Sequence, residues 1–264
     1  MRIPLFIATI GLLIAATVAA LAGLAAYVAN RLIPAQTRQD YRDSSGVITG
    51  IVGTLFAVSI GLVVVAAWNQ VNTATETSAT EASNLTDVYW YSRTLPAPQR
   101  AALQSLATGY TTTVIREEWP LMAGQHRLSQ NAWRASEQLR AFFQTLQPDG
   151  GGPSARYGQA MSRMQAVLDA RRSRAQMADT GVPPLLWVAL AGCGLVALLP
   201  AILCGSSNRK VHLTMAAAVG GMVGLVLFLV YQLDFPFSGG ISVSPAAFEQ
   251  ALDRFDSIRA LGTG

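Results

Sequence analysis

Few residues of this chain have the type and spacing that chemistry requires, and the most informative is a single carboxylate, Asp234. It follows a run from Leu213 to Leu233 that contains no charged residue and is long enough to cross a bilayer. A carboxylate at the membrane end of a helix is costly unless it faces water, a base or an ion. Two interpretations follow: a salt bridge to an arginine, or contact with permeating ions at a gate. The candidate mouth or gate comprises Gln232, Asp234, Pro236 and Phe237.

The groups from which soluble enzymes build active sites are missing from the sequence. His126 and His212 fall on opposite sides of the membrane in the predicted topology, so they cannot share a zinc ion. Cys193 and Cys204 are eleven residues apart, about 16 Å along one helix, which is too far for a disulfide bond. The sequence has neither a Gly-rich phosphate loop with a lysine nor a nucleophile elbow. We therefore predict no catalysis, no metal and no other cofactor. The arginines are scattered, which argues against nucleic-acid binding.

The composition is that of a membrane protein. Of the 264 residues, 51% are hydrophobic and 13% are charged. Four uncharged runs can cross a bilayer; they are Ile3–Asn30, Gly46–Val71, Gly181–Leu203 and Leu213–Leu233. The first could be a signal peptide, but it exceeds the ~7–15 apolar residues of such a segment. We predict an all-α integral membrane protein with four transmembrane helices and a helical extramembrane bundle inserted between the second and third.

Breaks in the pattern divide the chain into four parts. Residues 1–71 form a transmembrane hairpin with spans 3–30 and 46–71, joined by a polar loop from Ala35 to Ser45. Residues 72–180 form the extramembrane bundle, in which the second span continues as a helix before three further helical stripes. Residues 181–237 form a second hairpin with spans 181–203 and 213–233. Pro236 ends it, and 238–264 is an amphipathic tail with a new helix after Pro245.

The second span has the clearest pattern. At 100° per residue, small side chains gather on one face, while bulky ones crowd the opposite side; the small ones are Gly46, Gly50, Gly53, Ala57 and Gly61. Such a stripe usually lets another helix approach closely. The alternative is that copies of this helix surround a narrow conduit, with Phe56 or Ile60 as a constriction. Span four repeats small residues at 216, 220 and 224, which favours tight helix contact.

Charged residues of the insertion allow two interpretations. Arg171, Arg172 and Arg174 precede the third span by about ten residues, where arginines often contact lipid headgroups. The alternative is that they pair with Glu81 on the long second helix. The segment Glu118-Trp119-Pro120 is either an interfacial anchor or a helix terminus that packs on its neighbours.

Several motifs together resemble the bacterial bestrophin-like family over nearly the whole chain. They include Gly53-Thr54-Leu55-Phe56, Glu81-Ala82 with Leu85 and Tyr89, Glu118-Trp119-Pro120, and Arg171 with Arg174. Further along are Pro184 with Trp187, then the most specific motif, Leu233-Asp234-Phe235-Pro236-Phe237-Ser238-Gly239, and Val243-Ser244-Pro245 with Phe248.

The resemblance implies a pentamer of four-span subunits in a bacterial inner membrane, with the second spans lining an ion pore. It also implies a cytoplasmic insertion, whereas the arginines of the short loops slightly favour the other side. Bestrophins follow the fourth span with an acidic run that binds calcium. Residues 240–247 contain no carboxylate, so calcium gating is not carried over.

We therefore expect a homo-oligomeric channel for small inorganic ions in a lipid bilayer. Its pore or neck residues would be Gly50, Gly53, Phe56, Ala57, Ile60 and Gly61, and Glu81, Arg171 and Arg174 would give ion-pair support. The alternative is a non-conducting membrane scaffold or sensor whose helical insertion binds a partner.

Overall fold

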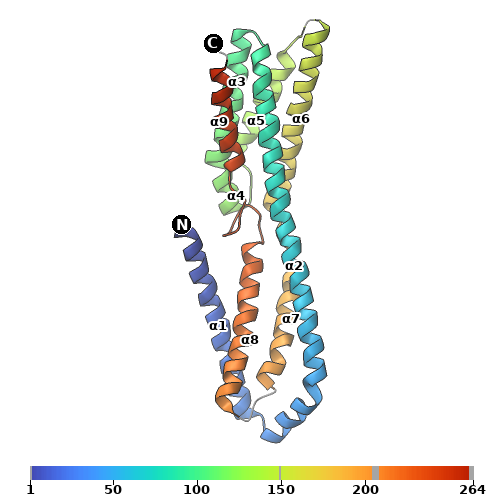
Figure 1. Ribbon diagram of the computed structural model, residues 1–264, viewed down its shortest axis with the longest axis vertical. Coiled ribbons are helices and arrows are strands. Elements are labelled where there is room, and N and C mark those ends of the chain that lie inside the picture. The colour runs from blue at the N-terminus through green and yellow to red at the C-terminus, as the bar shows by residue number, and fades with distance from the viewer. Residues whose placement is uncertain (1, 149, 204–207, 262–264) are drawn as a thin grey trace. The chain divides into compact units, whose positions relative to one another are not determined.

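The structure is a computed structural model that describes residues 2–148, 150–203 and 208–261, with only the backbone given for 2–6, 35–36 and 38–48. The described residues form helices and connecting turns without a β-strand. The chain divides into two compact units, which are residues 1–68 with 182–234, and residues 69–181 with 235–264. Figure 1 labels the helices of both units.

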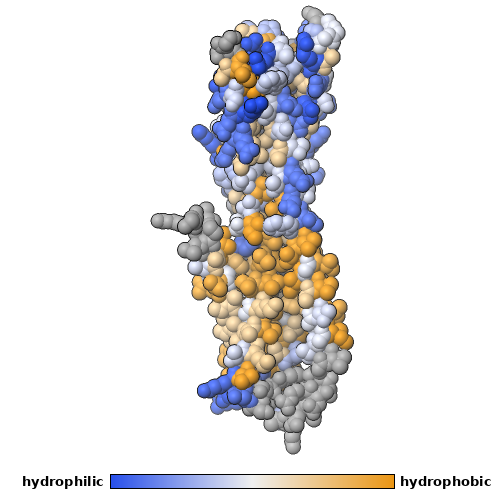
Figure 2. Space-filling model, viewed as in Figure 1, coloured by the Kyte–Doolittle hydropathy of each residue, from blue (hydrophilic) through white to orange (hydrophobic). Residues whose placement is uncertain are grey.

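The first unit contains α1 (Arg2–Leu32), the first part of α2 (Ala35–Tyr91), α7 (Pro184–Leu203) and α8 (Arg209–Gln232). Each of these four helices belongs to a segment that is long and apolar enough to cross a membrane. Asn208 caps the start of α8, because its side-chain oxygen accepts a hydrogen bond from the Lys210 backbone N–H at 3.0 Å. In Figure 2, hydrophobic residues cover most of the visible surface of this unit.

Helices α1 and α8 pack closely within the first unit (Figure 1). A Cβ atom added to Gly220 would lie 2.5 Å from the Ala22 Cβ, and one added to Gly224 would lie 2.9 Å from the Val18 Cβ. These glycines therefore let the two backbones approach, and Ala216 in the same stripe is fully buried. The prediction of tight helix contact by span four is confirmed.

The predicted loop between spans one and two is wrong. The backbone of residues 35–45 is helical, and α2 runs without interruption for 57 residues from Ala35. The charged residues of this stretch suggested a loop, but polarity alone does not end a helix. Neither glycine nor proline occurs between Ala35 and Ser45, so nothing in the backbone chemistry breaks the helix after Pro34. The connection from α1 therefore comprises only Ile33 and Pro34.

The second unit is a helical bundle with its own core. It contains the rest of α2, the 3-10 helix η1 (Ser92–Thr94), α3 (Ala97–Thr113), the π-helix η2 (Val114–Glu118), α4 (Trp119–Gln125), α5 (Gln130–Thr145), α6 (Gly151–Asp179) and α9 (Ala246–Ala260). Fully buried side chains from five of these helices form the core: Leu85, Leu103, Leu139, Met164 and Phe248. The three expected helical stripes correspond to α3, α5 and α6; the short α4 was not predicted.

Prolines and a side-chain cap separate the helices of this unit. Pro96 immediately precedes α3, and the Ser129 side chain caps α5 by accepting from Asn131 N at 3.1 Å and Ala132 N at 3.4 Å. Pro245 precedes α9, as expected from its place in a first turn. In Figure 2 the visible surface over this unit is largely hydrophilic.

Candidate functional site

The small-residue face of α2 is uncovered in the first unit. Gly50, Gly53, Ala57 and Gly61 are all exposed. A Cβ added to any of the three glycines would meet no atom within 4 Å. Among the residues that the structure describes, no helix of the subunit therefore covers the stripe, in contrast to the glycines of α8.

Phe56 and Ile60 lie on a neighbouring face of α2 that packs inside the subunit. The Phe56 ring lies against Gly194 of α7, with its Cε2 atom 3.4 Å from the place of an added Cβ. Ile60 packs against the buried cluster of Val63, Leu190 and Val230. Four of the six predicted pore residues thus lie on one open face of α2, and the other two, Phe56 and Ile60, lie on the neighbouring face. Their role at a neck stays a prediction.

Asp234 ties the end of α8 to the segment before α7. Its Oδ1 accepts a hydrogen bond from the Val182 backbone N–H at 2.7 Å. Among the residues that the structure describes, Asp234 forms no ion pair with an arginine. Gln232, the last residue of α8, is buried. This carboxylate satisfies an N–H that precedes the first turn of α7.

The remaining mouth residues lie in the second unit. Pro236 accepts a hydrogen bond through its carbonyl from the Val243 backbone N–H at 2.8 Å, which closes the connection before α9. Gly239 within that connection has φ 82°, a left-handed conformation that favours glycine. The Phe237 ring is 2% exposed and packs edge-to-face on Trp119 at 5.6 Å between centroids. Pro236 and Phe237 are therefore part of the packing of their own unit.

Four charged side chains meet in the core of the second unit, and all four are fully buried. Arg174 holds Glu81 through Nε to Oε2 at 2.8 Å and Nη2 to Oε1 at 3.0 Å, and its Nη1 lies 2.7 Å from Glu118 Oε1. Arg171 binds Glu118 through Nη1 to Oε1 at 2.9 Å and Nη2 to Oε2 at 2.7 Å. Two carboxylates and two guanidinium groups balance, so the cluster has no net formal charge.

Aromatic groups enclose this cluster. The Tyr110 hydroxyl accepts a hydrogen bond from Arg171 Nη1 at 3.0 Å and donates one to Glu81. The Arg171 guanidinium carbon lies 4.5 Å from the Trp133 ring centroid, and that of Arg174 lies 5.5 Å from the Trp119 centroid. Neither buried arginine can meet a lipid headgroup, and Arg174 pairs with Glu81.

A local distortion positions Glu118. Pro120 has no N–H to offer the preceding turn, and the chain forms a π-turn in which the Trp119 N–H bonds the Val114 carbonyl, five residues back. The Glu118 carboxylate is fully buried in the cluster, whereas the adjacent Glu117 is exposed. The sequence analysis offered an interfacial anchor or a helix terminus for Glu118-Trp119-Pro120 and missed the ion pairs of Glu118 with Arg171 and Arg174. Pro120 was the signal for the turn.

Burial and charge act in opposite directions on these groups. Burial raises the pKa of Glu118, but Arg174 and Arg171 together more than offset it, so its pKa lies below the ordinary value of 4.5. For Tyr110, burial and then the Glu81 charge raise the pKa well above the usual range. At neutral pH the carboxylate is therefore charged and the phenol is neutral.

His212 has a structural role that the sequence did not reveal. It is buried at the start of α8, where its Nε2 lies 2.9 Å from the Ala201 carbonyl of α7 and its Nδ1 lies 2.9 Å from the Asn30 amide nitrogen of α1. A carbonyl only accepts, so Nε2 donates and Nδ1 accepts from Asn30. The imidazole thus links three helices. No group of three His, Cys, Asp or Glu side chains that could hold a metal is found in the described part of the chain.

The helical fold and the four apolar spans define a multi-pass membrane protein. The family model for the bestrophin-like domain matches residues 16–248. The chain therefore belongs to the bestrophin-like family, as its motifs indicated.

Crystal structures of a bacterial bestrophin homologue from Klebsiella pneumoniae share this fold. One form with a single mutation has a TM-score of 0.71 at 13% identity, covering 92% of this chain and 98% of that chain. A structure phased with zinc has a TM-score of 0.70 at 13% identity, with coverage of 92% and 98%. Another single mutant covers 96% of this chain and 98% of its own, with a TM-score of 0.71 at 12% identity. No curated protein matches the chain.

Proposed function

We propose that this protein is a homo-oligomeric channel for small inorganic ions, with its lumen formed by the small-residue face of α2. The observation that carries the proposal is the open stripe of Gly50, Gly53, Ala57 and Gly61, which no helix in the described part of the subunit covers. A helix face with so little side-chain bulk lets identical copies come close around an axis.

The other faces of α2 support this arrangement. Leu55 and Leu62, on the side away from the stripe, are 62% and 68% exposed and suit contact with lipid. Val63 faces the subunit interior and is buried. In the proposed assembly, the bulky side chains of α2 therefore face lipid and its interior face packs against α7 and α8. Its small-residue face lies toward the symmetry axis. Phe56 and Ile60 border that bare face near the proposed neck.

The finer features of the proposal come from the family resemblance. We propose a pentamer in the bacterial inner membrane, with the bundle of residues 72–180 in the cytoplasm. Gln232, Asp234, Pro236 and Phe237 would border one mouth, where we assign Asp234 a positioning role because its carboxylate already binds the Val182 N–H. Glu81, Arg171 and Arg174 would stiffen the bundle around the long α2.

Flux through the purified protein in liposomes tests the proposal. Gly53→Cys, in a background where Cys193 and Cys204 are replaced by alanine, should lose most of its flux when treated with a charged thiol reagent. The matched variant Val58→Cys, at a position whose native side chain is 55% exposed on the opposite face, should keep its flux under the same treatment.

Two outcomes would reject the proposal. Wild-type protein that reconstitutes as an oligomer without any flux would favour the non-conducting scaffold or sensor. Equal inhibition of the Gly53→Cys and Val58→Cys variants would move the conduit away from the glycine stripe. Substituting Gly53→Trp then gives an independent check, since a bulky ring should block a lumen at this face.

A further inference from the structure

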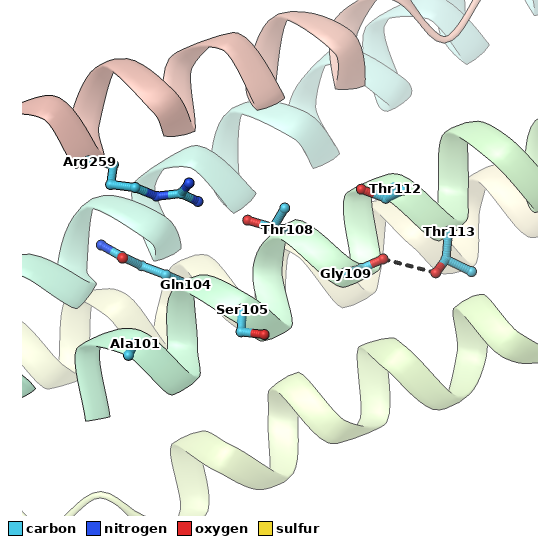
Figure 3. Close-up of a pocket in the computed structure, with 8 residues that line it drawn as sticks. All are labelled: Ala101, Gln104, Ser105, Thr108, Gly109, Thr112, Thr113 and Arg259. Carbon is cyan, nitrogen blue, oxygen red and sulfur yellow. Dashed lines mark hydrogen bonds between the residues drawn. The ribbon is translucent and has the colours of Figure 1, made fainter. Parts of the chain in front are cut away.

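A polar groove between α3 and α9 is used by none of the features described so far. It is open to the surface and has a volume of about 650 Å³. It is lined by one face of α3 and by Arg259 of α9 (Figure 3); the α3 residues are Ala101, Gln104, Ser105, Thr108, Gly109, Thr112 and Thr113. Among these described lining residues, Arg259 carries the charge.

The Arg259 guanidinium is held in place but not neutralised by a buried acid. Its Nη2 donates to the Tyr89 hydroxyl at 3.3 Å. Its Nη1 is 3.6 Å from Asp256 Oδ1, in a pair whose side chains are 53% and 77% exposed and therefore weakly coupled. A guanidinium has five N–H donors, so these contacts leave donors for a ligand. Figure 3 shows the guanidinium directed from α9 toward α3.

A hydroxyl on α3 lacks a partner beside this guanidinium. Thr108 Oγ1 is closed to solvent and has no hydrogen-bond partner among the described atoms. A hydroxyl of this kind is unfavourable unless a water or another bound molecule satisfies it. Thr108 and Arg259 face each other across the groove, with Thr112 one turn further along α3 (Figure 3).

Small residues keep the groove open. A Cβ added to Gly109 would meet no atom within 4 Å, so a side chain at this position would enter free space. The Thr113 hydroxyl donates a hydrogen bond to the Gly109 carbonyl at 2.9 Å, as drawn in Figure 3. Gln104 donates to Ser92 Oγ at 3.1 Å, which fixes its amide at the edge of the groove.

We propose that this groove binds a small molecule through a phosphate group, with Arg259 opposing the charge and Thr108 donating a hydrogen bond. A planar guanidinium fork together with hydroxyl donors matches the several oxygens of a phosphate. The groove is larger than the phosphate group alone, which leaves room for the molecule that carries it. This site is independent of the channel assignment.

Phosphorus NMR of the full-length protein, in a detergent without phosphate, tests the proposal. Three probes separate the sources of the phosphate: inorganic phosphate, glycerol 3-phosphate as a lipid headgroup fragment, and adenosine monophosphate. We expect saturable binding of at least one probe. Arg259→Gln should weaken that binding about tenfold or more, because it removes a charge-assisted hydrogen bond.

Two further variants keep the test decisive if Arg259→Gln disturbs α9. Thr108→Val keeps the side-chain shape and should weaken binding about threefold to tenfold. Gly109→Leu places a bulky side chain in open space at the edge of the groove and should weaken binding without touching α9. The matched control is Arg254→Gln, which removes an equal charge from an exposed position of α9 outside the groove.

Three results would overturn the proposal. One is the absence of saturable binding for all three probes. Another is equal weakening by Arg254→Gln and Arg259→Gln, which would reflect general charge attraction. The third is unchanged affinity in both Thr108→Val and Gly109→Leu, which would place the ligand elsewhere.

Discussion

The two small-residue stripes of the first unit have similar sequences and different surroundings. The stripe on α8 is covered: added Cβ atoms at Gly220 and Gly224 would lie 2.5 Å and 2.9 Å from side chains of α1. The stripe on α2 is bare, with nothing within 4 Å of the same positions at Gly50, Gly53 and Gly61. The spacing of small residues therefore indicates only that another helix can pack closely against the stripe. Whether a helix of the same subunit does so depends on the tertiary packing.

The same contrast between covered and uncovered residues holds for the arginines of α6. Arg171 and Arg174 are completely buried and paired, whereas Arg172 between them pairs with Asp169 at the surface, where the side chains are 61% and 67% exposed. Identical side chains within four residues thus have different energetic roles. If burial by neighbouring helices determines the loss of stability, substitutions at buried and exposed positions should differ as follows.

The largest effect is expected for Arg174→Met. Removing this guanidinium leaves the fully buried Glu81 without its bidentate partner, which should cost about 3–5 kcal/mol of unfolding free energy. The matched change Arg172→Met should stay within about 0.5 kcal/mol. Denaturant unfolding followed by tryptophan fluorescence measures both. Similar losses in the two variants would contradict the role assigned to the buried cluster.

A smaller effect separates the two stripes. Gly220→Leu should destabilise the protein by about 1–3 kcal/mol, because a side chain there would overlap α1. Gly53→Leu should leave the unfolding midpoint of the detergent-dispersed monomer nearly unchanged but reduce flux in liposomes. Thermal unfolding in one detergent compares them. If Gly53→Leu destabilised the monomer as much as Gly220→Leu, the α2 stripe would be an internal contact.

Removing the His212 hydrogen bonds should cause a still smaller loss of unfolding free energy. His212→Leu removes the hydrogen bonds to Ala201 and Asn30 and should cost about 1–2 kcal/mol. His126, which is only partly buried, provides the comparison: His126→Leu should cost less. Thermal unfolding at neutral pH checks this order. A larger loss for His126→Leu would show that burial at the start of α8 does not set the effect.

The smallest predicted effect is the change in unfolding free energy per pH unit that Glu118 causes. Its pKa is lowered in the folded state, so its stabilisation is complete above the unfolded value near 4.5 and is lost as pH falls below it. One group contributes at most about 1.4 kcal/mol per pH unit. Unfolding of wild type and Glu118→Gln between pH 7 and pH 3.5 should show a steeper acid loss in wild type. Parallel profiles would exclude Glu118 as the source.

The sequence was sufficient for features that depend on local chemistry. Each apolar span is readable because a helix that crosses a membrane needs about 20 apolar residues in one run. Pro96 and Pro245 mark the starts of α3 and α9, where a proline without an N–H is tolerated, whereas α8 already ends at Gln232, before Pro236. The loop predicted from Ala35 to Ser45 failed for a related reason, since polar residues without glycine or proline do not end a helix. The bestrophin-like motifs are short strings of residues, so the sequence alone indicates the family.

Only the tertiary structure decided which of these local features meet. Glu81, Glu118 and Arg174 are separated by tens of residues, and their pairing depends on how α2, η2 and α6 pack. The bare face of α2 and the covered face of α8 have the same residue types, so no periodicity could distinguish them. The pattern of side chains can be read from one helix. Whether a residue is buried depends on a second helix that packs against it, and this burial determines how much a charged pair or a glycine contact contributes to stability.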